Sequence, residues 1–258
     1  MALDRDLLMD AFFNVAKFKT QGVFLDARWN SALASTNEGW WLDPKSKDFG
    51  PNAKYYQHNL AEAKMLLAAA GYPNGFETIS HVPGVELPYA KPAEAVTGMI
   101  SDLGIKSTTH VLDYVREYIP LYRDGNGQFE GWGFMSTAGG TTGGSAIGAL
   151  AIEYWSKGGA AFHGFSTSGS NDQSGDPQVD AMIEKARLEQ DIEKGRSIVF
   201  DLQRYLAKTV YALSNVGAAT GLTVAWPCVR NYRVFRGGHN SQMYRLWVDD
   251  TKPPFKSA

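Results

Sequence analysis

The sequence predicts an α/β fold, because segments with strand and helix patterns alternate along the middle of the chain. Strands are expected at 76–82, 105–111 and 129–134, and helices at 92–103 and 113–122. This order builds a sheet whose right-handed crossovers place helices on its faces. With 258 residues, 44% of them hydrophobic, the chain can bury a sizeable core. We therefore expect a mixed sheet with flanking helices.

The first part of the chain is predicted to hold one helix, at 4–15, and one long irregular passage, at 17–57. The passage is rich in Gly, Asn, Asp, Ser and Pro and carries Trp29, Trp40 and Trp41. Loops this long are usually functional or disordered, and three tryptophans argue against disorder. The tryptophans would either stack on a sugar ring or apolar ligand group, or anchor the passage to the domain, which is the commoner role.

The clearest single element is a helix predicted at 60–70. Asn59 is a favourable N-cap, and Gly71 stands where a left-handed residue ends a helix. Apolar residues recur between them at helical spacing: Leu60, Ala63, Leu66, Leu67 and Ala70. Residues 72–75, Tyr-Pro-Asn-Gly, then predict a turn into the strand at 76–82. Periodicity alone indicates a core-facing amphipathic helix, which occurs in every fold class.

The next helices are predicted from their first residues. Pro92 suits the first turn of the helix at 92–103, Asp113 caps the helix that ends at Tyr122, and Asp191 starts another helix. In the segment from Asp176 to Ala186, DPQVDAMIEKA, the aspartate caps and the proline takes the first helical position. Short strands are expected at 210–213, 222–226, 229–235 and 244–248.

Several segments resemble one protein family in the order of their residues. The segment at 59–76, NLAEAKMLLAAAGYPNGF, resembles the "EKAKKLLAEAGYPNGF" of the extracellular solute-binding proteins of family 5. These are receptors of ABC importers for peptides, nickel complexes, oligosaccharides and related solutes. The segment at 176–186 resembles the family's "NPEVDALIEKA", and residues 103–106 resemble its "LGIKVE" junction.

The resemblance implies a periplasmic-binding-protein-like (type II) fold, of which this chain would be the carboxy-terminal lobe. Residues 2–5, Ala-Leu-Asp-Arg, resemble the "A-[IL]-D-R" that opens a helix well inside family members. Met1 would then correspond to an interior position, with the amino-terminal lobe absent. We expect residues 1–225 to form the ligand-binding lobe, and 226–258 to supply closing strands that return to the missing lobe, plus a tail.

The resemblance also indicates a ligand site after the strand at 129–134. Gly131-Trp132 resembles the "GW" that precedes a loop lining the family's ligand cleft. In peptide-binding members an aspartate shortly after it holds the ligand's amino terminus, whereas this chain has no acid until Glu153. A buried ammonium without a carboxylate partner would cost several kcal/mol. The departure argues against a peptide with a free amino terminus.

The candidate ligand-binding residues are aromatic or lie in the loop after Trp132. They are Trp132, Phe134, Met135, Ser136, Thr137, Trp40, Trp41, Tyr154 and Trp155. This acid-poor set suits an apolar, sugar-like or amide ligand. The expected function is capture of a small solute between two lobes and its delivery to an ABC permease in the membrane, with no catalytic residue, metal or cofactor.

Charge and hydropathy limit the partners. The net charge of -2 gives no electrostatic reason to bind nucleic acid or an anionic membrane. No apolar run is long enough to span a bilayer, and the first residues lack a signal-peptide pattern. We expect a periplasmic or extracellular protein, with a lipid anchor in the missing amino-terminal region as one way of holding it there.

The alternatives are a small hydrolase and a single-domain binding module. The histidines, His58, His81, His110, His163 and His239, are scattered and show no metal-ligand spacing. Neither Ser145 nor Ser166 completes a G-x-S-x-G pattern, and the glycine-rich stretch at 139–148 lacks the lysine of a phosphate-binding loop. A base beside a nucleophile in a pocket would favour the hydrolase.

Overall fold

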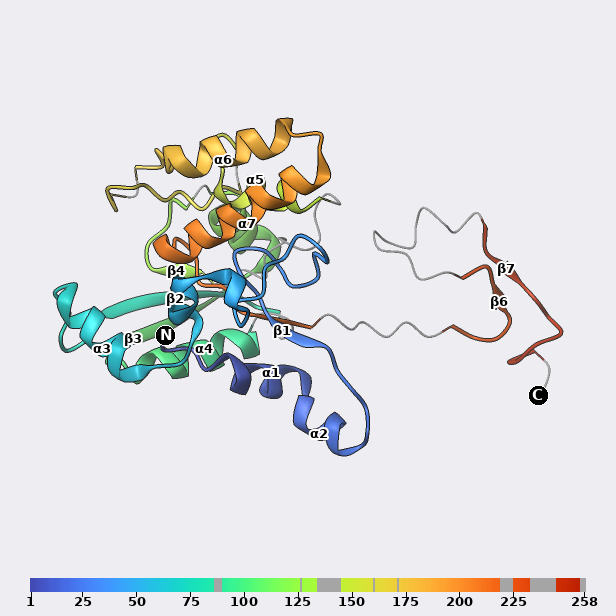
Figure 1. Ribbon diagram of the computed structural model, residues 1–258. Helices are drawn as coiled ribbons and strands as arrows, with labels where there is room; N and C mark the ends of the chain where they lie inside the picture. The colour runs from blue at the N-terminus through green and yellow to red at the C-terminus, as the bar shows by residue number, and fades with distance from the viewer. Residues whose placement is uncertain are drawn as a thin grey trace. The chain divides into compact units, whose positions relative to one another are not determined.

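A computed structural model describes residues 1–85, 90–125, 127–133, 145–159, 161–170, 172–218, 225–232 and 245–255 (Figure 1). The chain divides into two units, residues 1–219 and 220–258. Within the described residues, no helix combines the length and apolar character needed to cross a membrane.

The predicted α/β layer is present in the first unit. Strand β2 (Glu77–Pro83) lies between β3 (Lys106–Leu112) and β4 (Trp132–Gly133), and both neighbours are parallel to it. Helix α4 (Lys91–Ser101) connects β2 to β3, and the π-helix η4 (Tyr114–Arg123) follows β3. Parallel strands need such crossovers. The predicted fold class is confirmed, although β4 is shorter than the strand expected at 129–134, whose last residue lies outside the described residues.

Two glycines bring the entrances of β2 and β3 together. Gly75 precedes β2 with φ +77°, and Gly104 precedes β3 with φ +84°. A Cβ on Gly104 would lie 2.7 Å from the carbonyl oxygen of Asn74, and a Cβ on Gly75 would collide with the backbone of Gly104. Only glycine accepts both the left-handed conformation and this backbone contact. The "YPNG" turn and the "LGIK" junction therefore form one contact.

Four of the remaining helices begin where the sequence predicts: α1 (Arg5–Phe13), α3 (Leu60–Ala69), α6 (Pro177–Leu188) and α7 (Ile192–Thr209). The sequence pattern predicted neither α2 (Val15–Thr20) nor α5 (Ala146–Tyr154). The side chains of Asp4, Asn59, Asp113, Asp176 and Asp191 each accept a hydrogen bond from a backbone N–H in the first turn that follows. Such bonds satisfy donors that the helix itself leaves unpaired.

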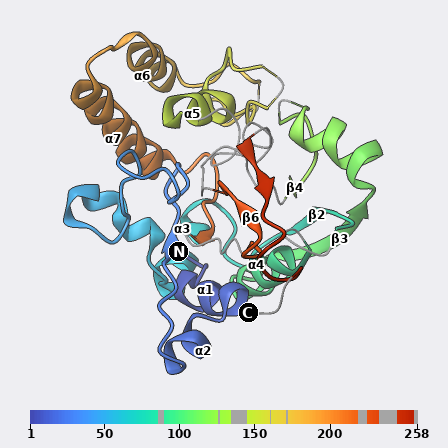
Figure 2. The same ribbon diagram turned by 90° about the vertical axis from the view of Figure 1, so that its right-hand side faces the viewer.

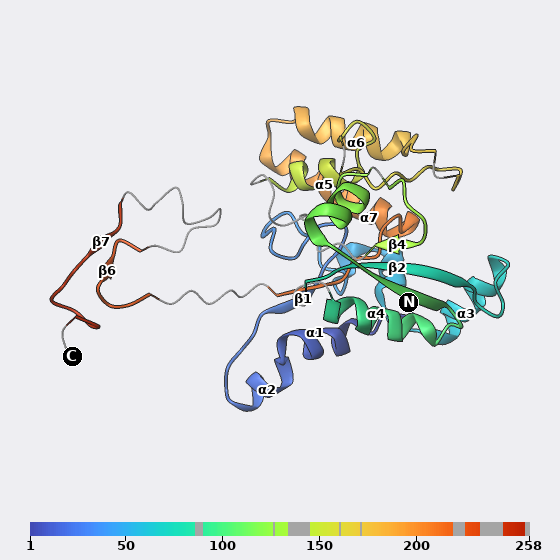
Figure 3. The ribbon, with the colours of Figure 1, turned by 180° about the vertical axis from the view of Figure 1, so that it is seen from behind.

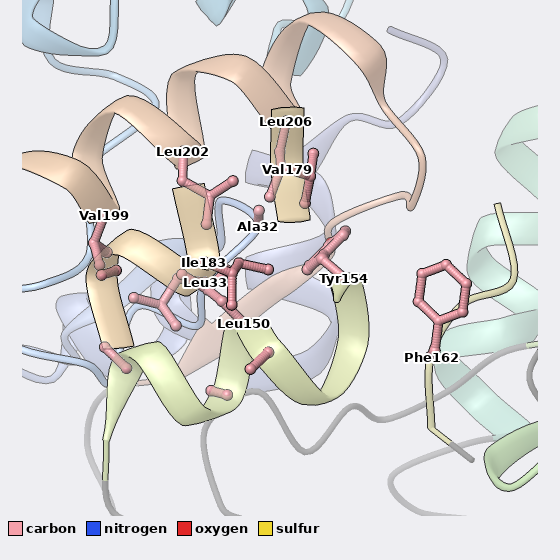
Figure 4. Close-up of a cluster of buried hydrophobic side chains, with 14 of the residues drawn as sticks. Ala32, Leu33, Leu150, Tyr154, Phe162, Val179, Ile183, Val199, Leu202 and Leu206 are labelled. Atoms are coloured by element: carbon pink, nitrogen blue, oxygen red, sulfur yellow. The ribbon is translucent and has the colours of Figure 1, made fainter. Parts of the chain in front are cut away.

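One hydrophobic cluster lies among α5, α6 and α7 (Figure 4). Leu150 comes from α5, Ile183 from α6, and Leu202 from α7, and each is about 1% exposed. Leu33 from the irregular passage joins them. The turned views show these three helices gathered on the side of the lobe away from α1 and α4 (Figure 2, Figure 3).

A second cluster lies around α1 and α4. It includes Leu8, Val96 and Phe49, the last from the 3-10 helix η1 (Lys47–Phe49), which is followed by η2 (Pro51–Tyr56). Strands β1 (Ala27–Trp29) and β5 (Val216–Ala218) pair antiparallel beside it, and Trp29 and Val216 belong to the cluster. The passage at 17–57 is therefore packed against the lobe.

One buried amide holds that passage against α7. Gln203 is fully buried, and its Oε1 accepts hydrogen bonds from Ser31 Oγ at 2.6 Å and from Leu42 N–H at 2.9 Å. Its Nε2 donates to the carbonyl oxygen of Trp40 at 2.8 Å and to that of Val199 at 3.2 Å. All the hydrogen-bonding capacity of the side chain is used, as a buried polar group requires.

Some sequence expectations were wrong in detail. The helix expected at 4–15 is two helices, because Asn14 is left-handed at φ 52°. The strand expected at 210–213 is absent: Val210 is left-handed at φ 50° and ends α7, and the strand lies at β5 instead. In the segment at 222–226 the first three residues lie outside the described residues, and the last two form no strand.

The second unit contains one short hairpin-like pair. Strands β6 (Val229–Arg230) and β7 (Trp247–Val248) are antiparallel, within the segments where closing strands are predicted. Arg230 forms an ion pair with Asp249 at 2.8 Å. The backbone N–H of Cys228 donates to the carbonyl oxygen of Pro253, which ties the tail to β6.

Candidate functional site

The first unit contains a cavity of about 770 Å³. Its wall is built from the end of α1, residues 30–34, the start of α4, residues 127–133, residues 153–154 and 161–163, and residues 211–216. These segments are distant in sequence and come from both hydrophobic clusters. A concave space with aromatic walls and a few polar groups is the usual form of a small-molecule site.

Two candidate residues, Trp132 and Tyr154, line this cavity. The indole Nε1 of Trp132 donates to Ser107 Oγ at 3.2 Å, which fixes the ring beside β3. Gly131, with φ +78°, sits so close to the carbonyl oxygen of Ile79 that a Cβ would collide with it. The "GW" pair thus combines a glycine that lets β4 approach β2 with an indole in the cavity wall.

The other candidates lie elsewhere. Trp40, Trp41 and Trp155 are not among the cavity-lining residues and pack instead against the cluster of α5, α6 and α7. Each has a guanidinium over its ring: Arg196 at 5.9 Å, Arg28 at 5.3 Å and Arg187 at 4.3 Å, respectively. Phe134, Met135, Ser136 and Thr137 lie outside the described residues.

Sequence reasoning missed two polar side chains in the cavity wall, Glu153 and His163. Glu153 lies near the end of α5 and is 6% exposed, and its Oε2 lies 3.9 Å from Nε2 of His163. The His163 ring stacks on Tyr154 with centroids 5.2 Å apart. Burial lowers the pKa of His163 to about 4, so the imidazole is neutral at pH 7. The sequence did hold one signal for α5, and with it for the position of Glu153: Ser145 caps this helix directly ahead of the apolar run at 146–152.

Arg5 of the "ALDR" segment supports the wall at 211–216. Its guanidinium is buried, and it donates to the carbonyl oxygen of Tyr56 at 2.6 Å and to that of Ser214 at 3.0 Å. It also lies 4.9 Å from the centre of the Tyr56 ring. Burial lowers the pKa of Arg5 to about 10, which leaves it charged at pH 7. The segment therefore supplies a cap, Asp4, and a buried cation that holds Ser214 in place.

Asp176 connects the start of α6 to the same wall. Its Oδ2 accepts hydrogen bonds from the hydroxyls of Tyr205 and Tyr211, each at 2.8 Å, and Tyr211 lines the cavity. Burial disfavours the charged carboxylate, but the tyrosine hydroxyls and the backbone N–H of Gln178 outweigh burial and lower the pKa of Asp176. Burial, followed by the hydrogen bond to Asp176, raises the pKa of Tyr211.

The metal-ligating side chains and the two candidate serines in the described part of the chain bear on other kinds of chemistry. No set of three or more His, Cys, Asp or Glu side chains there is placed to hold a metal ion. Ser145 caps α5, with its Oγ accepting from the N–H of Gly148, and the Ser166 hydroxyl lies 3.0 Å from that of Ser168. Among the described residues, neither serine forms a hydrogen bond with a histidine.

No family model matches the chain, and no curated protein matches its sequence. Solved structures do match it. The periplasmic binding protein DppA from Helicobacter pylori, in complex with the peptide STSA, superposes with a TM-score of 0.60 at 17% identity over 96% of this chain. The chain has a periplasmic-binding-protein fold. The expectation drawn from the sequence resemblance is confirmed at the level of the fold.

Other solved structures with this fold bind different solutes. NikA from Staphylococcus aureus, in complex with Ni(L-His)2, has a TM-score of 0.58 at 17% identity over 91% of this chain. AgaA from A. tumefaciens R10, in complex with agropinic acid, has a TM-score of 0.57 at 20% identity over 83% of it. This chain covers 42%, 43% and 40% of DppA, NikA and AgaA respectively, so it spans about two-fifths of these binding proteins.

Proposed function

We propose that this chain is the carboxy-terminal lobe of the substrate-binding component of an ABC-type importer, related to solute-binding family 5. The observation that carries the proposal is the fold match to DppA, which takes in 96% of this chain but 42% of DppA. The family-like order of residues at 59–76 and 176–186 supports it. The solved proteins that match are themselves binding proteins.

The proposed mechanism is capture without chemistry. A solute enters between this lobe and an amino-terminal lobe, and closure of the two around it is favoured by the surface that the solute buries. The closed form is then presented to a membrane permease in the periplasm or at the cell surface. Residues 1–225 supply one side of the site, and 226–258 supply strands that return to the other lobe.

The proposed ligand contacts centre on Trp132 and Tyr154, which both line the cavity. The segment at 134–137, which directly follows β4, remains a proposed contact on the family resemblance alone. Trp40, Trp41 and Trp155 would contribute only if a bound solute extends beyond the cavity. A single lobe offers about half the contacts of a closed site, so its affinity should be much lower than that of a two-lobe receptor.

Thermal-shift measurements test this function. The 258-residue chain and a version joined to an amino-terminal lobe are screened against peptides, oligosaccharides, nickel–histidine complexes and opines. A solute at about 100 times its Kd stabilises the folded state by about 2.7 kcal/mol, so the joined protein should show a clear rise in Tm. The single lobe should respond weakly to the same solute.

Two substitutions test whether the rise in Tm of the joined protein depends on the cavity. Trp132→Ala should abolish the shift, whereas Tyr72→Ala, at a side chain that is 49% exposed in the turn after α3 and does not line the cavity, should leave it unchanged. A joined protein that responds to none of these solutes would contradict the proposal. Turnover of a peptide or ester by the chain alone would favour the hydrolase instead.

A further inference from the structure

The cavity wall at residues 211–216 begins with an aromatic ring that packs on a second ring behind it. Tyr211 lines the cavity, and its ring stacks on that of Phe165, with centroids 3.9 Å apart and planes 9° apart. Phe165 is 9% exposed and also lies against Phe162 and Tyr154, at centroid distances of 5.0 Å and 6.3 Å. Phe162 and Tyr154 line the cavity as well. Phe165 therefore joins three cavity-lining rings into one packed aromatic wall.

The hydroxyl of Tyr211 is held by the start of α6. It donates to Oδ2 of Asp176 at 2.8 Å. Asp176 is 2% exposed, and α6 sets its position, because its Oδ1 caps the helix by accepting the N–H of Gln178. Residues 211–215 belong to no helix or strand. The stack on Phe165 and the hydrogen bond to Asp176 therefore define where Tyr211 lies in the wall.

Capping α6 does not by itself require an aspartate. Asparagine and serine are equally good N-caps, and the family segment "NPEVDALIEKA" has asparagine where this chain has Asp176. A carboxylate differs in offering two acceptor oxygens, whereas an amide offers one oxygen and an NH₂ donor. In Asp176, Oδ1 accepts from the helix and Oδ2 accepts from tyrosine hydroxyls. The aspartate thus serves the helix and the aromatic wall at once.

A second tyrosine bound to Asp176 provides an internal comparison. The hydroxyl of Tyr205 donates to the same Oδ2, also at 2.8 Å. Tyr205 lies in α7 and is not among the described residues that line the cavity. Removing either hydroxyl takes one hydrogen bond from the same oxygen, so the two losses of stability should be similar. Only the loss at Tyr211 affects a residue of the cavity wall.

We propose that Asp176 is a positioning residue for the cavity, holding Tyr211 in the aromatic wall against which a flat, uncharged part of the solute packs. The proposal rests on the proposed solute-binding function and specifies how one wall of that site is held. Asp176 is not among the described lining residues, so it acts through Tyr211. A ring that is already fixed loses little freedom when a solute stacks on it, and a looser ring binds more weakly.

The first test compares the two tyrosines. Fluorescence titration of the 258-residue chain with prodan, an uncharged flat naphthalene dye, measures affinity, and the amide signals of residues 211–216 should shift as the dye binds. Tyr211→Phe should weaken binding by about 3-fold to 5-fold, whereas Tyr205→Phe should stay within about 1.5-fold of the wild-type chain. Both variants should lose about 2–4 °C in Tm, since each loses one hydrogen bond.

The second test separates the cap of α6 from the tyrosine acceptor. Asp176→Ser keeps a good N-cap, but the shorter serine has one oxygen, which the cap uses. It should weaken prodan binding by about the same 3-fold to 5-fold as Tyr211→Phe. Adding Tyr211→Phe to it should weaken binding by less than about 1.5-fold more, because both substitutions remove the same interaction. A merely structural role of Asp176 would lower Tm without this non-additive effect on affinity.

Each outcome decides the proposal. Equal dye affinities of Tyr205→Phe and Tyr211→Phe overturn it, and this pair is decisive even if the serine variant does not fold. Additive effects of Asp176→Ser and Tyr211→Phe also overturn it, as does a dye that fails to saturate or leaves the signals of residues 211–216 unshifted. If a solute stabilises the joined protein in the thermal-shift screen while the dye results fail, the solute-binding function stands without this role for Asp176. If no solute stabilises it, the function fails, and the positioning role fails with it.

Discussion

Helices α3 and α6 begin in the same way but lie in different surroundings. Asn59 accepts the N–H of Glu62 at 3.0 Å to start α3, and Asp176 accepts the N–H of Gln178 at 2.8 Å to start α6. Both segments resemble the same family. In α6 the apolar residues Val179, Ile183 and Ala186 are at most 2% exposed, whereas in α3 only Ala63 is buried.

The difference separates what a local pattern determines from what it does not. A cap and a helical period are properties of a few neighbouring residues, so they predict both helices equally well. Burial depends on other elements: α6 is covered by α5 and α7, which supply Leu150 and Leu202. Leu66 of α3 remains 47% exposed.

The largest expected difference between the two helices comes from truncating one apolar side chain in each. Ile183→Ala should destabilise the lobe by about 3 kcal/mol, because it removes methyl groups and leaves a cavity among α5, α6 and α7. Leu66→Ala should cost less than about 0.5 kcal/mol. Urea unfolding measures both. A similar cost at Leu66 would mean that another surface covers α3 in solution.

The hydrogen bonds that connect Gln203 of α7 to residues 31–42 provide the next test. Gln203→Leu should destabilise the lobe by about 2–3 kcal/mol, because it leaves Ser31, the N–H of Leu42 and the carbonyl of Trp40 without their partner. Gln57→Leu, at an exposed position just before α3, is the control and should be close to neutral. Faster proteolysis within residues 30–42 of the Gln203 variant would place the damage in the passage that Gln203 holds.

The N-caps Asn59 and Asp176 should differ by a smaller amount in what their removal costs in unfolding free energy. Asn59→Ala should cost about 1 kcal/mol, the usual value for a lost N-cap. Asp176→Ala should cost about 2 kcal/mol, because Tyr205 and Tyr211 lose their acceptor as well. Equal costs for the two variants would show that the tyrosine hydrogen bonds add nothing to the cap.

The pH dependence of the Asp176 effect has a defined sign. The pKa of Asp176 is lowered from its ordinary value of 3.8, so its contribution to stability is fully present above that value. The contribution is lost as the pH falls through the lowered pKa. The difference in unfolding free energy between the wild-type chain and Asp176→Ala should therefore narrow below about pH 4. A difference that stays constant into acid would contradict this expectation.

A contrast of about the same size as that between the caps concerns the glycines that follow two helices. Gly71→Ala, after α3, should cost about 1 kcal/mol, because φ is +95° but nothing lies within 4 Å of the added Cβ. Gly104→Ala, after α4, should cost about 1 kcal/mol more, since its Cβ would also press on the carbonyl oxygen of Asn74. Thermal unfolding of the two variants measures both costs. Gly71→Ala reports the strain of the left-handed backbone alone, and Gly104→Ala reports that strain together with the steric contact.

Five helix starts were predictable, and the short strands β1 and β5 were not. The five N-caps act through hydrogen bonds to residues two or three positions away, so the sequence carries the whole signal. Strand β1 forms because Trp29 pairs with Val216 in β5, and no residue close to either of them in the sequence predicts this pairing. Val210 resembles a strand residue by composition, but its left-handed conformation ends α7.

The candidate site was predictable only in part. Trp132 follows a recognisable "GW" pattern, and Tyr154 was included as one of a group of aromatic residues; both line the cavity. Glu153 and His163 become neighbours through α5, and the glycine-rich residues before Ser145 obscured that helix in the sequence. Burial of a charged group depends on long-range packing, which residue spacing does not reveal.

The four hydrogen bonds of Gln203 affect how the protein is made. Its bonds to Ser31, Leu42 and Trp40 join residues 172, 161 and 163 positions apart. At about 5–20 residues per second, a ribosome needs roughly 10–30 seconds to synthesise the intervening chain. During that interval Trp40 and Trp41 are exposed on a nascent segment whose fixed position depends on a helix not yet synthesised. Chaperones therefore have a defined period in which to bind the first third of this lobe.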